Sequence, residues 1–556
     1  MRELVSRSFH PYCVFALTTL LALPFAPRLV TAETPVWGGK LVFVVPASEL
    51  PSYDAHREST FATIHPIRPF YSLLIKVNPQ NPSDPTDFVG DAAESWAISR
   101  DALTYTFKLR KGIKFHDGSL LTARDVKATY EKIIWPPKGV VSARSAMYSE
   151  VVKSVEAPDD STVVFRLNYA SAAFLPALAS PYNFIYKADI LKKDPHWYET
   201  HILGTGAFMP ASGTPAKGFA DGKWHVLGSY IDAVRNVDFF IKGRPYLDGY
   251  RAIWAKKQAR QVAAIRGGRA MINFRALPPK TVEELKNAMG DKIRVQESTW
   301  NCLLFVTPNH KVKPFDDPRV RRALSLALDR NEASKYLSTF AIVKTVGGIV
   351  YPFHPLAATK EELQKIAGYW PDIKKSRKEA RRLLREAGVP EGFKFKLHNR
   401  GVEQPYNYMG IWVIDQWRKI GLDVEHWVQP TVSFYKTLRG RKQAYQVSID
   451  FNCQSVVNPI LDVTKFLSED RSGSNNAGYI DRELDMIHAK MIREGDPKKV
   501  RALMRKFEKR ALDEEAHMIV TLWWHRTVAY NARLRGWKIS PSHYLNQHLV
   551  DVWLAK

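Results

Sequence analysis

Residues that carry chemistry are scattered along this 556-residue chain rather than gathered into motifs. No Gly-x-Ser-x-Gly turn and no His-Glu-x-x-His helix occurs, so two common hydrolase sites are missing. Residues 218–223 are similar to a phosphate-binding loop, but the spacing is short and Trp224 stands where the hydroxyl residue belongs. The sixteen histidines are dispersed, so a zinc site would have to be assembled by the fold. The sequence therefore predicts no enzyme and no cofactor, and a hydrolase without a recognisable motif is the alternative left open.

Cys302 and Cys453 are the only cysteines after residue 32 and lack Cys-x-x-Cys spacing. This is too few for a disulfide scaffold, so we expect two buried free thiols. A disulfide formed in an oxidising compartment is the alternative, because the sequence does not show how far apart the two residues lie.

The chain has a formal net charge of +25. Such a charge favours contact with polyanions or membrane surfaces, or serves solubility alone. Lysine and arginine are spread over polar helix faces, and no basic ribbon interleaved with aromatics appears. We therefore expect no nucleic-acid partner.

The segment 90–131 has the clearest local pattern. Apolar and polar residues alternate over 103–110, which predicts a half-buried strand. Turns follow at Lys111-Gly112 and Asp117-Gly118. Thr122 and Asp125 then form a capping box, which predicts that a helix begins there.

Other stretches predict strands at 40–45 and 162–167 and a helix that begins at Asp317-Pro318. A second capping box, Ser376 with Glu379, predicts a helix that stops at Gly388. A helix over 407–420 is followed by a strand over 422–428. Helices that alternate with strands are typical of α/β architecture.

The segment 90–131, GDAAESWAISRDALTYTFKLRKGIKFHDGSLLTARDVKATYE, resembles the signature of the extracytoplasmic solute-binding proteins of ABC transporters, family 5, the dipeptide, oligopeptide and nickel-binding group. The resemblance continues through most of the chain. Its further matches lie at 204–208, 235–249, 320–324, 380–388, 420–422, 479–485 and 536–537.

The resemblance implies a bilobal α/β periplasmic-binding-protein fold with a hinge and an extra α+β domain inserted in the first lobe. The expected parts are a first lobe of residues 33–76, 203–299 and 524–556, an inserted domain of residues 77–202 and a second lobe of residues 300–523. The chain would leave the first lobe near Trp300 and return near Trp524.

The implied function is capture of a peptide or peptide-like small molecule in the cleft between the lobes. The ligand would then pass to a membrane permease driven by an ATPase, with the binding protein a monomer. The alternatives are an anionic non-peptide ligand, such as an opine-like conjugate or a sugar derivative, and a non-transport role as a ligand sensor.

Two positions of the family pattern bear on the ligand. In dipeptide-type members an aspartate four residues before a second-lobe proline takes the ligand amine, and here that position is Ser455, before Pro459. An arginine ahead of a helix takes the ligand carboxylate, and Arg400 matches it. We therefore expect a ligand with an anionic group and no obligatory free amine, unless Asp450 or Asp462 supplies a displaced amine anchor.

Aromatic residues near the expected hinge and cleft are further candidates, with core packing as their alternative role. The group consists of Trp300, Tyr406, Tyr408, Trp412, Trp523 and Trp524. Tyr53 and His56, after the first strand, are weaker candidates. The expected ligand-binding residues are Arg400, Ser455, Asn452, Gln454, Trp300, Tyr406, Trp412, Trp523 and Tyr53.

The first 32 residues read as a signal peptide. Arg2 and Arg7 give a basic start, a short apolar core follows, and small residues precede a cut expected after Ala32. The apolar run is too short to span a bilayer. We expect the rest of the chain to be exported to the periplasm.

Overall fold

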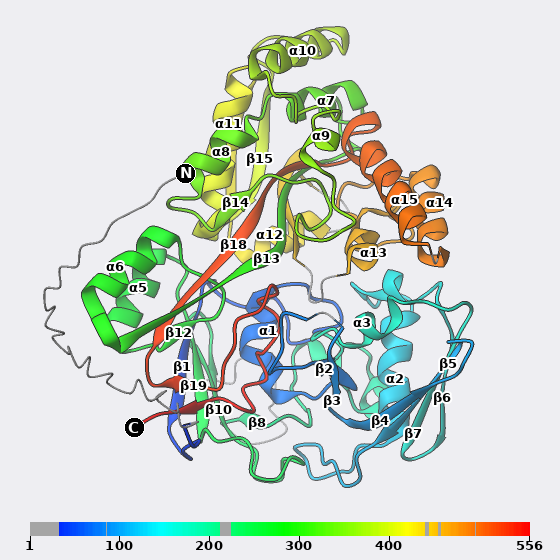
Figure 1. Cartoon of the computed structure of the whole chain (residues 1–556), viewed down its shortest axis with the longest axis vertical. Helices are drawn as coiled ribbons and strands as arrows, with labels where there is room; N and C mark the ends of the chain where they lie inside the picture. The colour runs from blue at the N-terminus through cyan, green and yellow to red at the C-terminus, as the bar shows by residue number, and fades with distance from the viewer. Residues whose placement is uncertain (1–32, 85, 212–223, 440–443, 454–457, 495) are drawn as a thin grey trace, which may run out of the picture. The chain divides into compact units, whose positions relative to one another are not determined.

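The computed structural model of the chain describes residues 33–84, 86–211, 224–439, 444–453, 458–494 and 496–556 (Figure 1). The expected signal peptide, the stretch 218–223 and the two site candidates Gln454 and Ser455 lie outside these residues. Residues 36–556 form one compact unit. Among the described helices, none combines the length and the hydropathy needed to cross a membrane.

A mixed sheet of twelve strands runs through the described part of the chain. Six strands belong to its first half: β1 (Lys40–Val45), β8 (Phe208–Pro210), β9 (His225–Val226), β10 (Tyr230–Arg235), β11 (Gly249–Trp254) and β12 (Ile272–Asn273). Four belong to its second half: β14 (Val343–Thr345), β15 (Lys394–Arg400), β16 (Asp423–Gln429) and β17 (Val447–Cys453). In the first half β1 runs parallel to both β11 and β12, and in the second half β15 runs parallel to both β16 and β17.

Two long antiparallel strands, β13 (Ile293–Pro308) and β18 (Ile519–Asn531), connect the halves (Figure 1). The C-terminal end of β18 pairs with β12 of the first half, and the C-terminal end of β13 pairs with β17 of the second. Their mutual register is interrupted between Thr299 and Leu303. The pair is therefore irregular where the chain passes from one half to the other.

Helices cover each half of the sheet. Those of the first half are α1 (Phe61–Ile67) with the turn η1 (Arg68–Phe70), α5 (Gln258–Arg266) and α6 (Pro279–Met289) with the turn η4 (Gly290–Lys292). Those of the second half are α7 (Pro318–Leu326), α8 (Arg330–Leu337), α9 (Lys360–Leu363), α10 (Ile373–Glu386), η5 (Glu403–Asn407), α11 (Tyr408–Arg418), α12 (Thr431–Arg439), α13 (Pro459–Asp462), η6 (Val463–Phe466), α14 (Arg482–Arg493), α15 (Pro497–Lys509) and η7 (Arg510–Glu514).

A separate four-stranded sheet, in the order β4-β5-β7-β6, lies in the segment between β1 and β8. The segment contains β2 (Ile75–Val77), β3 (Phe88–Gly90), β4 (Ala93–Ile98), β5 (Thr104–Leu109), α2 (Ala123–Ile134), η2 (Ser145–Met147), β6 (Val152–Asp159), β7 (Thr162–Leu167), α3 (Phe174–Leu178), α4 (Ala188–Lys193) and η3 (Trp197–Glu199). Helix α2 packs on this sheet. A short pair, β19 (Leu534–Arg535) with β20 (Trp553–Leu554), completes the strands of the described residues.

Most of the local predictions are confirmed. Strands β1 and β7 have the expected bounds, and α2 begins with the Thr122–Asp125 capping box. The second capping box is wrong, because α10 begins at Ile373 with Asp372 as its cap. Ser376 lies inside that helix, buried, and its hydroxyl donates to the carbonyl of Leu326 at 2.8 Å.

Candidate ligand-binding cleft

A narrow pocket lies between the two halves of the sheet. Ser59, which precedes α1, lines it together with Arg144 and Tyr182 of the segment inserted between β1 and β8, and the opposite lining includes Asn452 and Cys453 at the end of β17. Its volume is about 50 Å³, whereas ligand pockets usually measure about 300 to 1,000 Å³. This pocket is therefore too small to hold a peptide-sized ligand in the present conformation.

Arg400, the last residue of β15, does not line this pocket. Its side chain instead connects the two sides of the interface between the halves, which we call the cleft. Its side chain is completely buried, and Nε donates to Thr431 Oγ1 at 3.1 Å. Nη1 donates to the hydroxyl of Tyr435 at 3.2 Å, and Nη2 reaches Thr60 Oγ1 at 3.2 Å on the other side. All three acceptors are neutral, and among the described residues no carboxylate forms an ion pair with Arg400. The described residues therefore provide no carboxylate to balance the positive charge of Arg400.

Arg275 is a second buried arginine in the cleft, one that the sequence analysis did not single out. It follows β12, is 1% exposed, and donates through Nη1 to the backbone carbonyl of Gln404 in the second half. Its Nε and Nη2 atoms are buried without a hydrogen-bond partner in the described structure. The backbone carbonyl of Arg275 accepts from Arg526 Nε at 3.0 Å, which holds the residue in place.

The two guanidinium groups share two aromatic rings. Their carbon atoms lie 4.6 Å (Arg275) and 5.1 Å (Arg400) from the ring centroid of Phe61. The corresponding distances to the ring of Tyr406 are 5.8 and 5.6 Å. Burial, with the nearby charge of Arg400 adding to it, lowers the pKa of Arg275 to about 10. Both guanidinium groups thus contact the same two rings. These cation–π contacts replace only part of the hydration that the two charges lose on burial.

The buried carboxylates of the cleft are held by the protein itself. Asp450 forms an ion pair with Lys465 at 3.1 Å and accepts from Asn476 at 2.8 Å. Asp462 accepts from Asn301 at 3.2 Å, and burial raises the pKa of Asp462 well above its ordinary value. Neither carboxylate therefore offers an ionised, unoccupied partner for a ligand amine.

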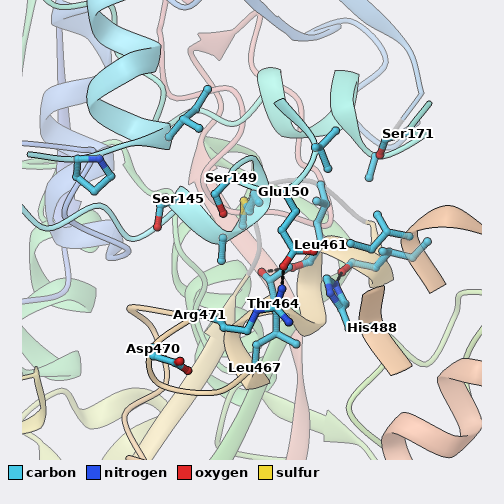
Figure 2. Close-up of a pocket in the computed structure, with 18 residues that line it drawn as sticks. Ser145, Ser149, Glu150, Ser171, Leu461, Thr464, Leu467, Asp470, Arg471 and His488 are labelled. Atoms are coloured by element: carbon cyan, nitrogen blue, oxygen red, sulfur yellow. Dashed lines mark hydrogen bonds and ion pairs between the residues drawn. The ribbon is translucent and has the colours of Figure 1, made fainter. Parts of the chain in front are cut away.

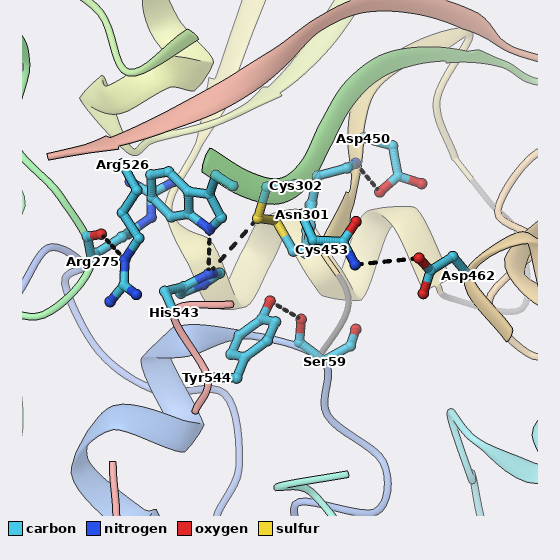
Figure 3. The surroundings of a disulfide bond; sticks show 12 residues. Ser59, Arg275, Asn301, Cys302, Asp450, Cys453, Asp462, Arg526, His543 and Tyr544 are labelled. Carbon is cyan, nitrogen blue, oxygen red and sulfur yellow. Dashed lines mark hydrogen bonds between the residues drawn. A yellow bond between two sulfur atoms is a disulfide. The ribbon is translucent and has the colours of Figure 1, made fainter. Parts of the chain in front are cut away.

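Cys302 and Cys453 form a disulfide, so the expectation of free thiols is wrong (Figure 3). Strand register is the physical reason: the pairing of β13 with β17 places the two residues directly opposite each other, with their Cα atoms 4.0 Å apart. His543 lies beside the bridge, with Nδ1 3.7 Å from Cys302 Sγ. Because both sulfurs are bonded to each other, this Cys-Cys-His group has no thiolate to offer a metal.

The predicted aromatic candidates occupy different places. Tyr406 lies between the two arginines, as described above. Trp300 is buried, and its indole donates to His543 Nδ1 at 2.9 Å, while Trp412 belongs to the core of the second half. Trp523 packs in a separate core, where it donates to the carbonyl of Gly348 at 2.9 Å, and Tyr53 packs in the core of the first half.

Asn452 is the one amide candidate within the described residues. It lines the pocket, and its side chain donates to the backbone carbonyl of Asp462 at 2.8 Å. The structure thus brings Arg400, Tyr406 and Asn452 into or next to the cleft, together with Arg275. The other described candidates lie in the packed cores, and we do not carry them into the ligand proposal.

A second pocket, of about 280 Å³, lies where the inserted segment meets the second half (Figure 2). Glu150 and Arg471 form an ion pair across it. Thr464 and Leu467 of the second half line it opposite Ser145 and Ser149, as Figure 2 shows. This contact joins the two sides of the cleft away from the long strands β13 and β18.

Comparisons with known proteins give a consistent result. The model of the family described as bacterial extracellular solute-binding proteins, family 5, middle region, matches residues 87–473. The heme-binding protein A of Haemophilus influenzae is 30% identical over 366 residues, which is 61% of each chain. The chain thus spans about 60% of the length of this curated relative.

Two solved structures resemble nearly the whole chain. The periplasmic binding protein DppA of Helicobacter pylori, in complex with the peptide STSA, has a TM-score of 0.77 at 22% identity and covers 94% of this chain and 99% of its own. AgaA from A. tumefaciens, in complex with agropinic acid, has a TM-score of 0.76 at 21% identity and covers 93% and 99%. These likenesses confirm the predicted bilobal α/β binding-protein fold.

Proposed function

Because this chain belongs to family 5 of the bacterial extracellular solute-binding proteins, we propose that it is the ligand-binding subunit of an ABC importer. The family consists of binding proteins rather than enzymes, and the ligand leaves this protein chemically unchanged. In the proposal the chain acts in the periplasm after a cut behind Ala32, and it hands its ligand to a membrane permease driven by an ATPase.

The observation that carries the proposal is the buried Arg400 on neutral partners between the two halves of the sheet. A guanidinium pairs with a carboxylate through two parallel hydrogen bonds, and this pairing is strongest where water is excluded. We therefore propose a peptide or peptide-like ligand whose carboxylate replaces the Thr60 and Thr431 contacts of Arg400.

Closure of the lobes would be the capture step. In the proposal one lobe comprises residues 33–76, 203–299 and 524–556, and the other comprises residues 300–523. The irregular register of β13 and β18 near Trp300 is where the strands can bend. A pocket of only about 50 Å³ in the present conformation fits a closed state that opens to admit ligand.

An anionic ligand that is not a peptide is the second candidate. It is favoured by Asp450, whose carboxylate is already occupied by Lys465 and Asn476 and so offers no site for an amine. Ser455 occupies the position where dipeptide-type members carry the amine-binding aspartate, and this replacement also favours a ligand without an amine. The solved structure of AgaA with agropinic acid belongs to a protein of the same fold.

Isothermal titration of residues 33–556, unfolded and refolded to remove retained ligand, tests the proposal. Di- to pentapeptides and opine-type conjugates form the panel, and chromatography of the mixture afterwards checks that the ligand is intact. We expect saturable one-to-one binding of at least one compound without turnover. Conversion of a bound compound would contradict the proposal in favour of a hydrolase.

A further inference from the structure

We propose that Arg275 and Arg400 together form a two-arginine subsite for a ligand that carries two acidic groups. This inference rests on the proposed binding function and goes further, because it assigns a role to Arg275 and specifies the charge of the ligand.

The first step is the charge balance of the cleft. The two arginines are 1% and 0% exposed, and neither forms an ion pair with any carboxylate in the described part of the chain. The four residues that follow Cys453, Gln454 to Val457, contain no acid in the sequence either. Glu58, buried two residues before Thr60, forms its ion pairs with Arg57 and Arg439 and not with either of the two arginines. Removing two positive charges from water without counter-charges is costly, so anions from outside the chain would stabilise the closed state.

The second step is the hydrogen-bonding capacity. Arg275 has two buried nitrogen atoms, Nε and Nη2, without an acceptor. These two atoms lie on one edge of a guanidinium, the edge that binds a carboxylate in a bidentate manner. A carboxylate placed there would satisfy both donors and supply the missing charge.

The third step concerns the number of acidic groups. Arg400 donates to Thr431, Tyr435 and Thr60, which leaves two of its five N–H groups, and Arg275 donates through Nη1 to Gln404. Each arginine therefore has its own set of partners. The rings of Phe61 and Tyr406 contact both cations. Two cations on shared rings are best neutralised by two anionic groups a few bonds apart, as in a dicarboxylate such as a peptide ending in glutamate or an N-carboxyalkyl amino acid.

The arrangement also couples ligand charge to closure. Arg275 belongs to the first half of the sheet and Arg400 to the second, so closing the cleft brings two like charges together. Without an anion their repulsion opposes closure, and a dianionic ligand removes that repulsion. A neutral analogue of the same shape gains no such advantage.

The test uses glutarate, a five-carbon dicarboxylate, against its neutral diamide, glutaramide, in a thermal-shift assay of residues 33–556 at constant ionic strength. We expect glutarate at about 100 times its dissociation constant to raise the melting temperature of the wild-type protein by about 2 °C or more relative to glutaramide. Arg275→Gln should lose at least half of this difference. Arg260→Gln is the matched control, because Arg260 is an exposed arginine of the same half of the sheet, and it should keep the full difference.

Equal melting temperatures with glutarate and glutaramide in the wild-type protein would overturn the two-arginine subsite, and this comparison requires no variant. So would an undiminished glutarate effect in Arg275→Gln. Arg275→Lys keeps the charge but not the bidentate edge, and it should retain only part of the effect. Binding of uncharged, C-terminally amidated peptides with no response to glutarate would reject the subsite and leave the importer proposal intact.

Discussion

The two buried arginines of the cleft, Arg400 and Arg275, have only uncharged partners. Arg400 and Arg275 rest on hydroxyl groups, a backbone carbonyl and aromatic rings, while the nearby Asp450 is paired with Lys465. This distribution of charge supports the proposal of an anionic ligand.

Replacing Arg400 tests its role directly. Arg400→Gln removes the charge that would pair with the ligand carboxylate and should weaken binding by about 2 to 4 kcal/mol, or at least about 30-fold in Kd. Isothermal titration with a carboxylate ligand and with its amide measures the effect. Arg418→Gln removes an exposed arginine of the same half and should leave both affinities unchanged. An equal loss of affinity for the acid and for the amide would show that Arg400 does not bind the carboxylate.

Asp462 gives the cleft a pH-dependent contribution to stability. Burial raises its pKa in the folded protein, so unfolding releases a proton at pH values between the ordinary pKa and the folded-state pKa. The resulting decrease in the free energy of unfolding is absent below the ordinary aspartate pKa of about 3.9. It grows as the pH rises toward the folded-state pKa. Asp462→Asn cannot ionise and should therefore stabilise the protein at pH 7.5 and lose this advantage near pH 4.

Urea unfolding at the two pH values measures that difference. Asp291→Asn, at an exposed position in η4, is the control and should change the free energy of unfolding little at either pH. A loss of stability in Asp462→Asn at pH 7.5 would mean that the ionised carboxylate is needed in the fold.

At the scale of elements, the disulfide joins two strands of the second half of the chain. It closes a loop with a sequence separation of 151 residues between β13 and β17. Constraining so long a loop in the unfolded chain stabilises the fold, so the double variant Cys302→Ser with Cys453→Ser should lose about 3 to 5 kcal/mol. Urea unfolding with and without a reducing agent measures this, and the reducing agent should affect only the wild type. Insensitivity of the wild type to reduction would contradict the predicted contribution.

The turn Gly204-Thr205-Gly206 packs closely against the backbone of η1. A Cβ atom on Gly206 would lie 2.3 Å from the carbonyl oxygen of Pro69, and the Gly206 amide donates to the carbonyl of Phe70. Gly206→Ala should therefore cost about 1 to 3 kcal/mol in the free energy of unfolding, because the backbone cannot give way. Gly473→Ala, whose Cβ would meet nothing nearer than 3.6 Å, is the control for the same unfolding measurement. Equal stabilities of the two variants would refute the close approach.

Elements with a strong local signal could be predicted from the sequence. Alternation identified β5, the strand patterns of 40–45 and 162–167 identified β1 and β7, and Asp317 with Pro318 identified the start of α7. The start of α10 was misplaced because Asp372, one turn earlier, supplies the capping carboxylate while Ser376 faces the core.

The site could be predicted only in part, for a different reason. Arg400 stands in a recognisable family position, but Arg275 has no local pattern, because its burial depends on residues 61, 406 and 524 brought together by the fold. The disulfide was missed likewise, since the register between β13 and β17 is a long-range property.

At the scale of the whole molecule, two halves of one sheet are joined by two long strands, and the buried arginines lie between them. In the proposal this arrangement couples the charge of the ligand to closure of the cleft. The relatives and solved structures support the fold and the family, and the charges in the cleft support the proposed anionic ligand.

A thermal-shift screen of refolded residues 33–556 tests the central claim most directly. The panel pairs each free acid, from dipeptides to opine-type conjugates, with its amide. A ligand at about 100 times its dissociation constant should stabilise the fold by about 2.7 kcal/mol. The account predicts shifts with acids, largest for compounds with two acidic groups, and none with the matching amides. Equal shifts with acids and amides, or no shift with any compound of the panel, would contradict it.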